Sequence, residues 1–208
     1  MNLFVTGTDT GVGKTYVASR LVRALRRAGF DCAPMKPICA GDRADAEALF
    51  EACGGVEPLN VINPVWYRTP AAPYTAAIVE ERPVDLALIR ETFGGLRARH
   101  RSLVVEGVGG WMAPIERDFF VGDLAEEFRL PVAVVVRNRL GALNHALLTV
   151  RDIERRGLPF AGFIFNNVDG GTDDVAAATN REILADLLKQ QPLFVLEPGQ
   201  PRIELGLE

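Results

Sequence analysis

Residues 2–15 of the chain read NLFVTGTDTGVGKT, and this stretch decides the fold class. A short apolar run leads into a turn with glycines at positions 7, 11 and 13, and then into Lys14 and Thr15, where an amphipathic helical pattern begins. A strand, a glycine-rich turn and a helix in this order predict a phosphate-binding loop, because glycine lets backbone amides turn toward an anion at the start of a helix. We expect the Lys14 ammonium group to reach the outer phosphates and the Thr15 hydroxyl to lie beside a Mg²⁺ ion.

The spacing of this loop differs by one residue from the usual pattern. The first glycine of the usual motif would stand at Thr8, whereas this chain has Gly7 one position earlier, so the loop is one residue longer. The strand before it and the helix after it still favour a phosphate site over a chance Gly-Lys-Thr turn.

Strand and helix patterns alternate along the rest of the chain. Several strand patterns are continuously apolar, which is typical of strands covered on both faces of a parallel sheet. We therefore predict an α/β fold, a three-layer sandwich similar to the P-loop NTPases, with a mostly parallel central sheet and one domain over residues 1–208. Strands are predicted at 2–6, 31–35, 102–106, 132–137, 161–166 and 193–196, helices at 14–28, 44–53, 74–80, 85–99, 121–128, 142–156 and 173–189, and an inserted loop with one short helix at 60–83.

The composition excludes several classes of protein. With 48% hydrophobic residues the chain is not intrinsically disordered. Lys and Arg number 23 against 27 Asp and Glu, so the sequence predicts no basic surface for nucleic acid or an anionic membrane. No basic and apolar leader and no long apolar run are present, so we expect neither a secretory signal nor a transmembrane helix. Three cysteines without a C-x-x-C pair favour a reducing, cytoplasmic location.

Further charged residues stand where a phosphate site would need them. Glu106 ends an apolar strand and precedes a Gly-Val-Gly-Gly run, so its carboxylate should face the ligand-binding edge of the sheet, where Mg²⁺ needs one. Lys36, held by Pro37 after the second strand, either reaches the transferred phosphoryl group or is a surface lysine. Asp45 is either a metal ligand or a first-turn acid that stabilises its helix, and Asp42 competes for the ligand role.

Six segments between residue 4 and about residue 170 carry a resemblance to one enzyme family. They are FVTGTDTGVGKT (4–15), MKPICAGDRADAEAL (35–49), NPVWYRTPAAPY (63–74), VVEGVGGWMAPI (104–115), RLGALNHALLT (139–149) and FIFNNV (163–168). With these segments in this order, the chain resembles the dethiobiotin synthetases, ATP-dependent ligases of biotin biosynthesis. That family has the longer phosphate loop that this chain has.

The resemblance implies a reaction that needs no covalent protein nucleophile. One amine of a diamine similar to 7,8-diaminononanoate takes up CO₂ as a carbamate, and ATP phosphorylates the carbamate to a carbamic–phosphoric anhydride. The second amine then closes the ureido ring, and ADP and phosphate are released. Positioning and charge neutralisation are the protein's tasks in such a scheme. ATP and Mg²⁺ are the cofactors that the resemblance implies, and a homodimer is the assembly.

The resemblance also implies roles for individual residues. Lys36 and Lys14 would be catalytic, and Mg²⁺ would be held by Thr15, Asp45 and Glu106. Asn144 would contact the diamine partly across the dimer interface, and the helix near Pro73 would receive the substrate carboxylate. The nucleotide would be bound by Thr10, Gly11, Val12, Gly13, Lys14, Thr15, Tyr16, Glu106, Gly107, Val108, Gly109 and Asn166, and the diamine by Lys36, Ala40, Ala72, Pro73, Gly109 and Asn144.

The chain departs from the family's pattern at two places. Ala40 and Ala72 stand where the family often has a hydroxyl residue, so the backbone or neighbours such as Cys39 and Tyr74 would make those substrate contacts. Near the C-terminus, the family's Gly-x-Ile-Pro-like segment beside the adenine is replaced by FVLEP at 194–198. The sequence therefore leaves the choice among ATP, CTP and GTP open.

Two other classes of protein share the phosphate loop. Partitioning or regulatory ATPases have a lysine near the start of the loop, where this chain has Asp9, and often add a membrane-binding helix. Amidoligases acting on larger acids, such as cobyrinic acid, would need a glutaminase domain, for which 208 residues leave no room. We therefore expect the ligase rather than either alternative.

Overall fold

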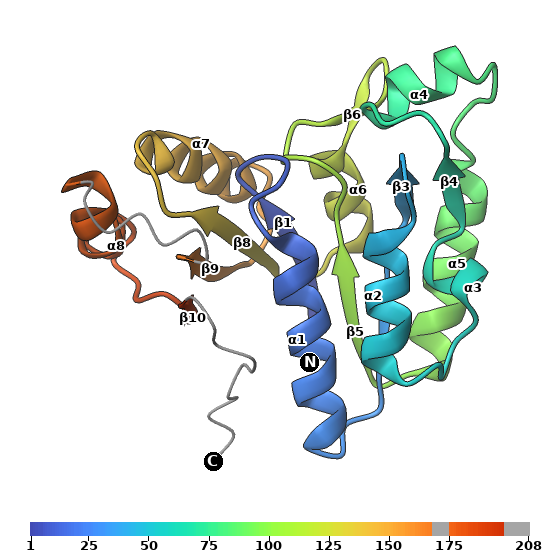
Figure 1. The fold of residues 1–208 in the computed structure, drawn as a ribbon, viewed down its shortest axis with the longest axis horizontal. Coiled ribbons are helices and arrows are strands. Elements are labelled where there is room, and N and C mark those ends of the chain that lie inside the picture. Colours follow the sequence, from blue (N-terminus) through green and yellow to red (C-terminus); the bar gives the residue numbers. More distant parts are fainter. Residues whose placement is uncertain (168–174, 198–208) are drawn as a thin grey trace.

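Six parallel strands form the central sheet of the computed structural model, which describes residues 1–167 and 175–197. The strand order is β10-β9-β8-β1-β5-β2 (Figure 1). Valine-rich runs such as β8 are buried on both faces, as parallel strands between helices must be. The strands are β1 (Asn2–Gly7), β2 (Cys32–Met35), β5 (Ser102–Glu106), β8 (Val132–Arg137), β9 (Phe160–Asn166) and β10 (Phe194–Leu196).

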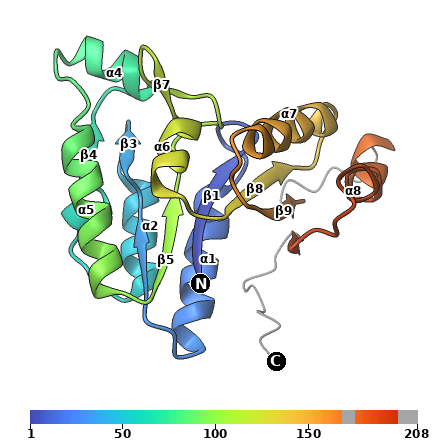
Figure 2. The same ribbon diagram turned by 180° about the vertical axis from the view of Figure 1, so that it is seen from behind.

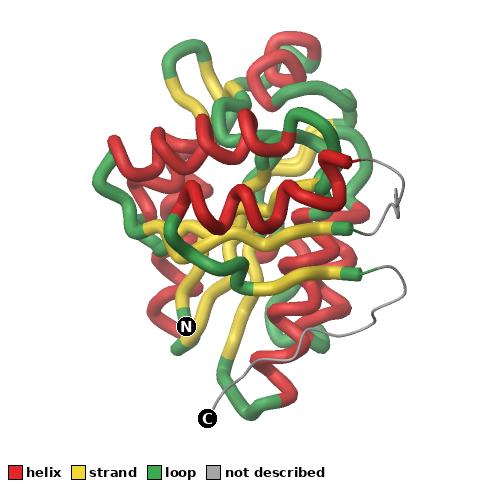
Figure 3. The backbone as a smooth tube through the Cα atoms, turned by 90° about the vertical axis from the view of Figure 1, so that its left-hand side faces the viewer, coloured by secondary structure: helices red, strands yellow, loops and turns green. Residues whose placement is uncertain are grey.

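Helices cover both faces of this sheet, so the described residues form three layers (Figure 2, Figure 3). On one face lie α1 (Lys14–Arg27), α2 (Ala44–Cys53) and the short α3 (Leu59–Ile62), and on the other α5 (Leu86–Arg99), α6 (Val121–Phe128), α7 (Ala142–Arg155) and α8 (Val175–Leu188). Alternate residues of a strand enter opposite cores, since Phe4 packs in one apolar cluster and Val5 in the other. The predicted α/β fold with a parallel sheet is confirmed.

Four short strands and one helix lie outside this framework of long elements. They are β3 (Ile38–Ala40) paired parallel with β4 (Val65–Tyr67), β6 (Pro114–Glu116) paired antiparallel with β7 (Phe119–Phe120), and α4 (Pro73–Val79), which packs against β6. In Figure 1, β3, β6 and α4 lie beyond the carboxyl end of β5. They cover part of the carboxyl edge of the sheet, where the phosphate loop also lies.

The sequence predicted the long elements within one or two residues. The strands at 102–106 and 132–137 and the helices at 44–53 and 121–128 have the predicted bounds. The short helix predicted at 74–80 is present as α4, but the expectation that the rest of 60–83 is loop was wrong, because this stretch also holds β4 and the end of α3. Strands of two or three residues are too short for any periodic pattern to reveal. Residues 173–174 of the last predicted helix and the tail after residue 197 lie outside the described residues.

No helix in the two described ranges has both the length and the apolar composition needed to cross a membrane.

A histidine joins two acidic residues at the edge of the sheet away from the phosphate loop. His100, at the end of α5, has Nδ1 at 2.7 Å from Asp31 Oδ1 and Nε2 at 2.8 Å from Glu57 Oε1, and Arg99 also donates to Glu57 at 2.8 Å. Partial burial lowers the pKa of His100, but the hydrogen bonds and charges of Asp31 and Glu57 outweigh it, so the pKa is raised. The protonated ring therefore holds the start of β2, the loop before α3 and the end of α5 together.

We expect His100 to make the stability of the protein pH-dependent. Because its folded-state pKa lies above the unfolded value of about 6.5, its contribution is complete about one unit below that value and is lost as the pH rises through the folded-state pKa. The difference in unfolding free energy between wild type and His100→Gln should therefore shrink as the pH rises from about 5.5 through the raised folded-state pKa. Urea titrations at several pH values measure it, with His145→Gln as the control at the chain's other histidine. A difference that grows with pH would contradict the assignment.

Candidate functional site

The turn between β1 and α1 has the backbone geometry of a phosphate-binding loop. Gly11 and Gly13 have φ angles of 71° and 94°, in the left-handed region that favours glycine. A Cβ atom on Gly7 would lie 2.5 Å from Val12 Cγ2, so the loop can close only with glycine there. Asn166, at the end of β9, donates from Nδ2 to the Val12 carbonyl at 2.9 Å and fixes the loop from below.

The side chain of Lys14 bends back over this loop. It is buried, and Nζ donates to the Asp9 carbonyl at 3.0 Å. Burial, with a further contribution from nearby Lys36, lowers the pKa of Lys14 to about 8. Asp9 in turn caps the Thr10 amide at 2.7 Å and pairs with Arg139 at 3.3 Å. The ammonium group is therefore buried beside the backbone of the loop, where we propose that a phosphate binds.

We expect Gly13→Ala to abolish most nucleotide binding. A Cβ atom there would collide with the Asn166 amide that holds the loop, and the residue would be strained at a φ of 94°. Gly29→Ala is the matched control, because Gly29 has a similar φ of 83° but open space around its missing Cβ. Backbone strain should cost each variant about 1 to 2 kcal/mol of stability, to which Gly13→Ala adds the collision with Asn166. Only Gly13→Ala should weaken nucleotide binding, by about tenfold or more. Calorimetric titration with ADP measures the difference, and equal affinities would refute it.

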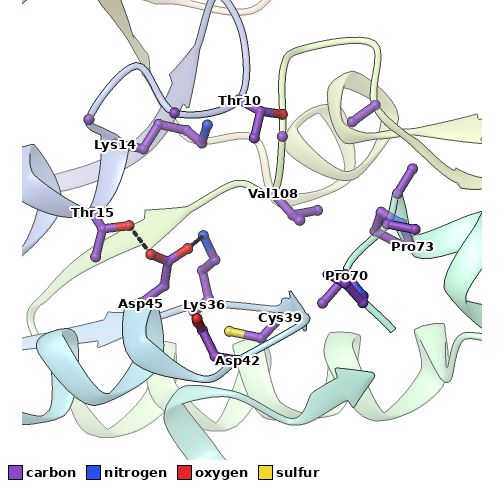
Figure 4. A pocket seen from close by; sticks show the side chains of 17 residues that line it. Thr10, Lys14, Thr15, Lys36, Cys39, Asp42, Asp45, Pro70, Pro73 and Val108 are labelled. Carbon is purple, nitrogen blue, oxygen red and sulfur yellow. Dashed lines mark hydrogen bonds and ion pairs between the residues drawn. The ribbon is translucent and has the colours of Figure 1, made fainter. Parts of the chain in front are cut away.

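Four side chains from different elements meet beside the loop. Lys36 Nζ lies 2.5 Å from Glu106 Oε1 and 2.7 Å from Asp45 Oδ2, and it donates to the Gly107 carbonyl at 3.2 Å. The Thr15 hydroxyl lies 2.5 Å from Asp45 Oδ1 (Figure 4). It also lies 2.7 Å from Glu106 Oε1. The sheet order explains the meeting, because β1, β5 and β2 are neighbours and their carboxyl ends lie together.

Burial governs the electrostatics of this cluster. Glu106 is completely buried, and desolvation raises its pKa despite the attraction of Lys36. Burial alone would lower the pKa of Lys36, but Glu106 and Asp45 outweigh it and hold that pKa above its usual value. Burial likewise opposes ionisation of Asp45, yet Lys36 and Thr15 hold its pKa below the usual range. Lys36 is therefore a permanent ammonium group between two carboxyl groups.

The oxygen atoms of the cluster fit a magnesium ion. Glu106 Oε2 is buried without a hydrogen-bond partner, and the Thr15 hydroxyl and the Asp45 carboxylate stand next to the same glutamate. Mg²⁺ in phosphoryl-transfer sites takes one or two carboxylates and completes its shell with phosphate oxygens and water. Within the described residues no group of three or more His, Cys, Asp or Glu side chains that could hold a metal ion is found.

An asparagine that the sequence did not single out holds the backbone of Lys36. Asn63 is buried, and Nδ2 donates to the Lys36 carbonyl at 2.9 Å and to the Val65 carbonyl at 2.8 Å. Its Oδ1 accepts from Arg43 Nε at 3.0 Å, and Arg43 directly precedes α2, which carries Asp45. One amide therefore fixes Lys36 and the start of α2 relative to each other. The sequence signal was slight, since Asn63 only opens one of the segments shared with the resembled family.

These elements surround a cavity of about 660 Å³, a size typical of small-molecule sites. The phosphate loop forms one wall, the end of β2 and the start of α2 form another, and Val108 lies across from Lys36 near the Pro70–Pro73 segment (Figure 4). Its lining is Thr10, Gly11, Gly13, Lys14, Thr15, Lys36, Cys39, Ala40, Asp42, Asp45, Pro70, Ala71, Ala72, Pro73, Val108, Gly109 and Ala113.

Most of the residues expected from the sequence border this cavity, and the others lie around it. Glu106 and Gly107 lie behind Lys36, whereas Val12 is buried within the loop. Tyr16 stacks on Arg20, whose guanidinium carbon is 3.2 Å from the ring centroid, and it is not part of the cavity wall. Asn144 is exposed on α7 and is likewise outside the cavity of a single chain.

The structure separates the two aspartates that the sequence left as alternatives. Asp45 contacts both Lys36 and Thr15, whereas Asp42 accepts the Ala44 amide at 3.2 Å and is exposed at the cavity rim. Pro70, Ala71 and Ala113 also line the cavity, although the sequence did not indicate them. They reach it through the short strands β3, β4 and β6, which carry no pattern of their own.

The parallel sheet and the glycine loop that opens α1 define a P-loop nucleotide-binding protein. A family model described as "AAA domain" matches residues 1–193. A ParA family ATPase from Chlorobium tepidum TLS has a similar fold, with a TM-score of 0.57 at 13% identity over 95% of this chain and 85% of that one. A likeness at this identity concerns the fold alone.

Two curated relatives narrow the class. An ATP-dependent dethiobiotin synthetase BioD from Anaeromyxobacter dehalogenans (strain 2CP-C) is 49% identical over 205 residues, which is 97% of this chain and 91% of that protein. One of the same name from Akkermansia muciniphila is 44% identical over 206 residues, covering 99% and 96%. The chain belongs to the dethiobiotin synthetase family, as the resemblance predicted.

Proposed function

We propose that this protein is an ATP-dependent dethiobiotin synthetase, a C–N bond-forming ligase that acts on 7,8-diaminononanoate, CO₂ and ATP. The observation that carries the proposal is the position of Lys36. Its ammonium group lies between Asp45 and Glu106 and borders the same cavity as the phosphate loop. A cation at this position can stabilise the negative charge of a carbamate and of the phosphoryl group that is transferred to it.

The chemistry makes three bonds in sequence. A neutral amine of the diamine attacks CO₂ and loses a proton, which leaves a carbamate anion. A carbamate oxygen attacks the γ-phosphorus of ATP, and the bond to ADP breaks. The second amine then attacks the carbonyl carbon, phosphate leaves, and the ring closes with loss of a proton. No step needs a protein nucleophile, so positioning and electrostatic stabilisation are sufficient.

The side chains in the cavity divide this work. Lys14 and Lys36 neutralise the negative charge that carbamate and phosphates bring together, in a buried setting where each charge acts strongly. Thr15, Asp45 and Glu106 would hold Mg²⁺, which when bound supplies further charge neutralisation at the outer phosphates. The wall at Pro70–Pro73 and Val108 keeps water from the carbamic–phosphoric anhydride, which would otherwise hydrolyse.

The diamine is proposed to lie between Lys36 and the wall formed by Ala40, Ala72, Pro73 and Gly109. Cys39 lines the same wall, and burial raises the pKa of its thiol to about 11. A thiol that stays protonated is a weak, neutral donor. It can take the place of the hydroxyl that the family often has beside it, at Ala40.

A homodimer would bring Asn144 to the substrate. Asn144 and Leu148 lie one helical turn apart on the exposed face of α7, and Leu140 precedes them; Leu140 and Leu148 are 80% and 63% exposed. Apolar side chains this exposed indicate a covered surface. Light scattering should give the mass of a dimer for wild type and of a monomer for Leu148→Glu. A wild-type monomer would remove Asn144 from the site.

The proposed setting is the cytoplasm, with small molecules and a second copy of the chain as partners and neither nucleic acid nor membrane. The three cysteines are free and buried, which suits a reducing compartment.

The direct test is phosphate release with ATP, Mg²⁺, bicarbonate and the diamine, with the product detected by mass spectrometry. Release should depend on both the diamine and bicarbonate, and dethiobiotin should appear. Repeating the assay with CTP and GTP measures the nucleotide preference. Hydrolysis of ATP that is indifferent to the diamine would instead support a switch ATPase.

A further inference from the structure

Trp111 connects a wall of the cavity to helix α7. It lies in the loop of residues 107–113, which joins β5 to β6, and the residue is 3% exposed. The indole N–H donates to Asp152 Oδ2 on α7 at 2.8 Å. The ring also rests on α6, where a Cβ atom on Gly122 would come within 3.0 Å of it. The ring is therefore held on one side by a hydrogen bond and on the other by close packing.

The backbone of the loop is fixed at the same place. Gly122 N donates to the Trp111 carbonyl at 3.0 Å, and Val121 N donates to the Ala113 carbonyl at 3.1 Å. Ala113 N closes a turn onto the Gly110 carbonyl at 3.0 Å. If the indole moved, the whole loop would move with it, including the residues Val108, Gly109 and Ala113 that line the cavity.

Asp152 is held firmly enough to act as an anchor. Arg156 Nε donates to Asp152 Oδ2 at 2.7 Å, and Nη1 of the same arginine reaches Asp123 and Glu126 on α6 at 2.6 and 2.9 Å. Although burial opposes ionisation, the hydrogen bonds from Arg156 and Trp111 hold the pKa of Asp152 at about 2. The carboxylate is thus charged at any working pH.

Resting on the proposed function, we infer that Trp111 and Asp152 are positioning residues for the diamine. Neither is expected to contact a reacting atom. Their hydrogen bond sets the distance of the 107–113 wall from Lys36, and with it the space in which the carbamate forms. The phosphate loop has its own anchors, Thr8 N on the Val135 carbonyl and Asn166 on the Val12 carbonyl, so binding of the phosphates should depend on this bond much less than binding of the diamine does.

A purely structural role is the competing explanation, because Asp152 also joins α6 to α7 through Arg156. The variant Asp152→Asn separates the two. Its side-chain oxygen can still accept the indole N–H, whereas the charge that pairs with Arg155 and Arg156 is gone. Asp152→Leu removes both interactions, whereas Trp111→Phe removes the indole N–H together with part of the ring surface that packs on Gly122.

Steady-state kinetics with varied diamine and varied ATP test the inference, with melting temperatures measured alongside. We expect Asp152→Leu and Trp111→Phe to lower kcat/KM for the diamine by about ten- to a hundredfold, as small misplacements of a substrate do. KM for ATP should change by less than about twofold. Asp152→Asn should keep the kinetics with the diamine near those of wild type. The double variant Trp111→Phe with Asp152→Leu should have a kcat/KM for the diamine no lower than that of Trp111→Phe alone. Asp186→Leu is the matched control, because Asp186 on α8 makes a similar i,i+3 pair with Lys189, which directly follows that helix, outside the cavity.

Several results would overturn the inference. One is an Asp152→Asn enzyme as impaired toward the diamine as Asp152→Leu, since this would assign the effect to the lost charge. Another is a lowered melting temperature in all variants with unchanged diamine kinetics. Absence of diamine-dependent phosphate release in wild type would remove the proposed function itself, whereas normal wild-type turnover with normal Asp152→Leu kinetics would remove only the inference.

Discussion

Lys36→Met is expected to lower kcat by about 10²- to 10³-fold, the loss seen when one preorganised charge is removed from a transition state. Methionine keeps the length and the apolar stem but leaves the developing charge near Glu106 and Asp45 without its cation. The affinity for ADP should remain within about twofold of wild type, because the phosphate loop does not depend on Lys36. Single-turnover assays and calorimetric titration measure the two quantities.

The same substitution should also destabilise the fold, which needs its own control. Removing one partner of a buried ion pair costs about 3 to 5 kcal/mol, because the other charge stays buried alone. The double variant Lys36→Met with Glu106→Gln removes that leftover charge. It should recover much of the stability and none of the activity. Recovery of turnover in the double variant would show that Lys36 acts only by holding the fold together.

The sequence identified the residues of the site wherever they follow directly from a long element. The phosphate loop lies between a strand and a helix, and Glu106 ends a buried strand, so their place at the carboxyl edge of a parallel sheet was predictable. Lys36 was less certain, because a lysine after a strand is more often on the surface. Only the packing of β2 beside β5 shows that its ammonium group meets Glu106.

What the sequence could not give depends on the short elements. Asp45 and Asp42 are three residues apart on the same approach to α2, and only the direction of that helix decides which of them faces Lys36. Asn63, Pro70 and Ala113 enter the site through turns and through strands of two or three residues. Their positions are set by tertiary contacts, which local sequence patterns do not encode. Asn144 is a different case, since its proposed role needs a second copy of the chain.

Lys14→Met should have effects opposite to those of Lys36→Met. Nucleotide binding should be weakened, whereas the stability of the fold should be retained. Lys14 is buried beside the ammonium group of Lys36, and its pKa is lowered from 10.5 to about 8. Because this pKa is depressed in the folded state, the protonated side chain opposes folding at neutral pH by on the order of 3 kcal/mol. Replacing it with a neutral side chain of similar length removes that opposition, so the melting temperature should equal or exceed that of wild type.

Nucleotide binding should respond in the other direction. Lys14 begins α1 with its Nζ over the loop, where we propose that the outer phosphates lie, so Lys14→Met should weaken ATP binding by about a hundredfold and ADP binding by less. Lys189→Met, at an exposed ion pair at the end of α8, is the control for loss of a positive charge. Calorimetric titrations with both nucleotides, together with thermal melts, complete the comparison. If Lys14→Met melted well below wild type, or bound ATP as tightly, the buried ammonium group would not be the phosphate ligand that its position indicates.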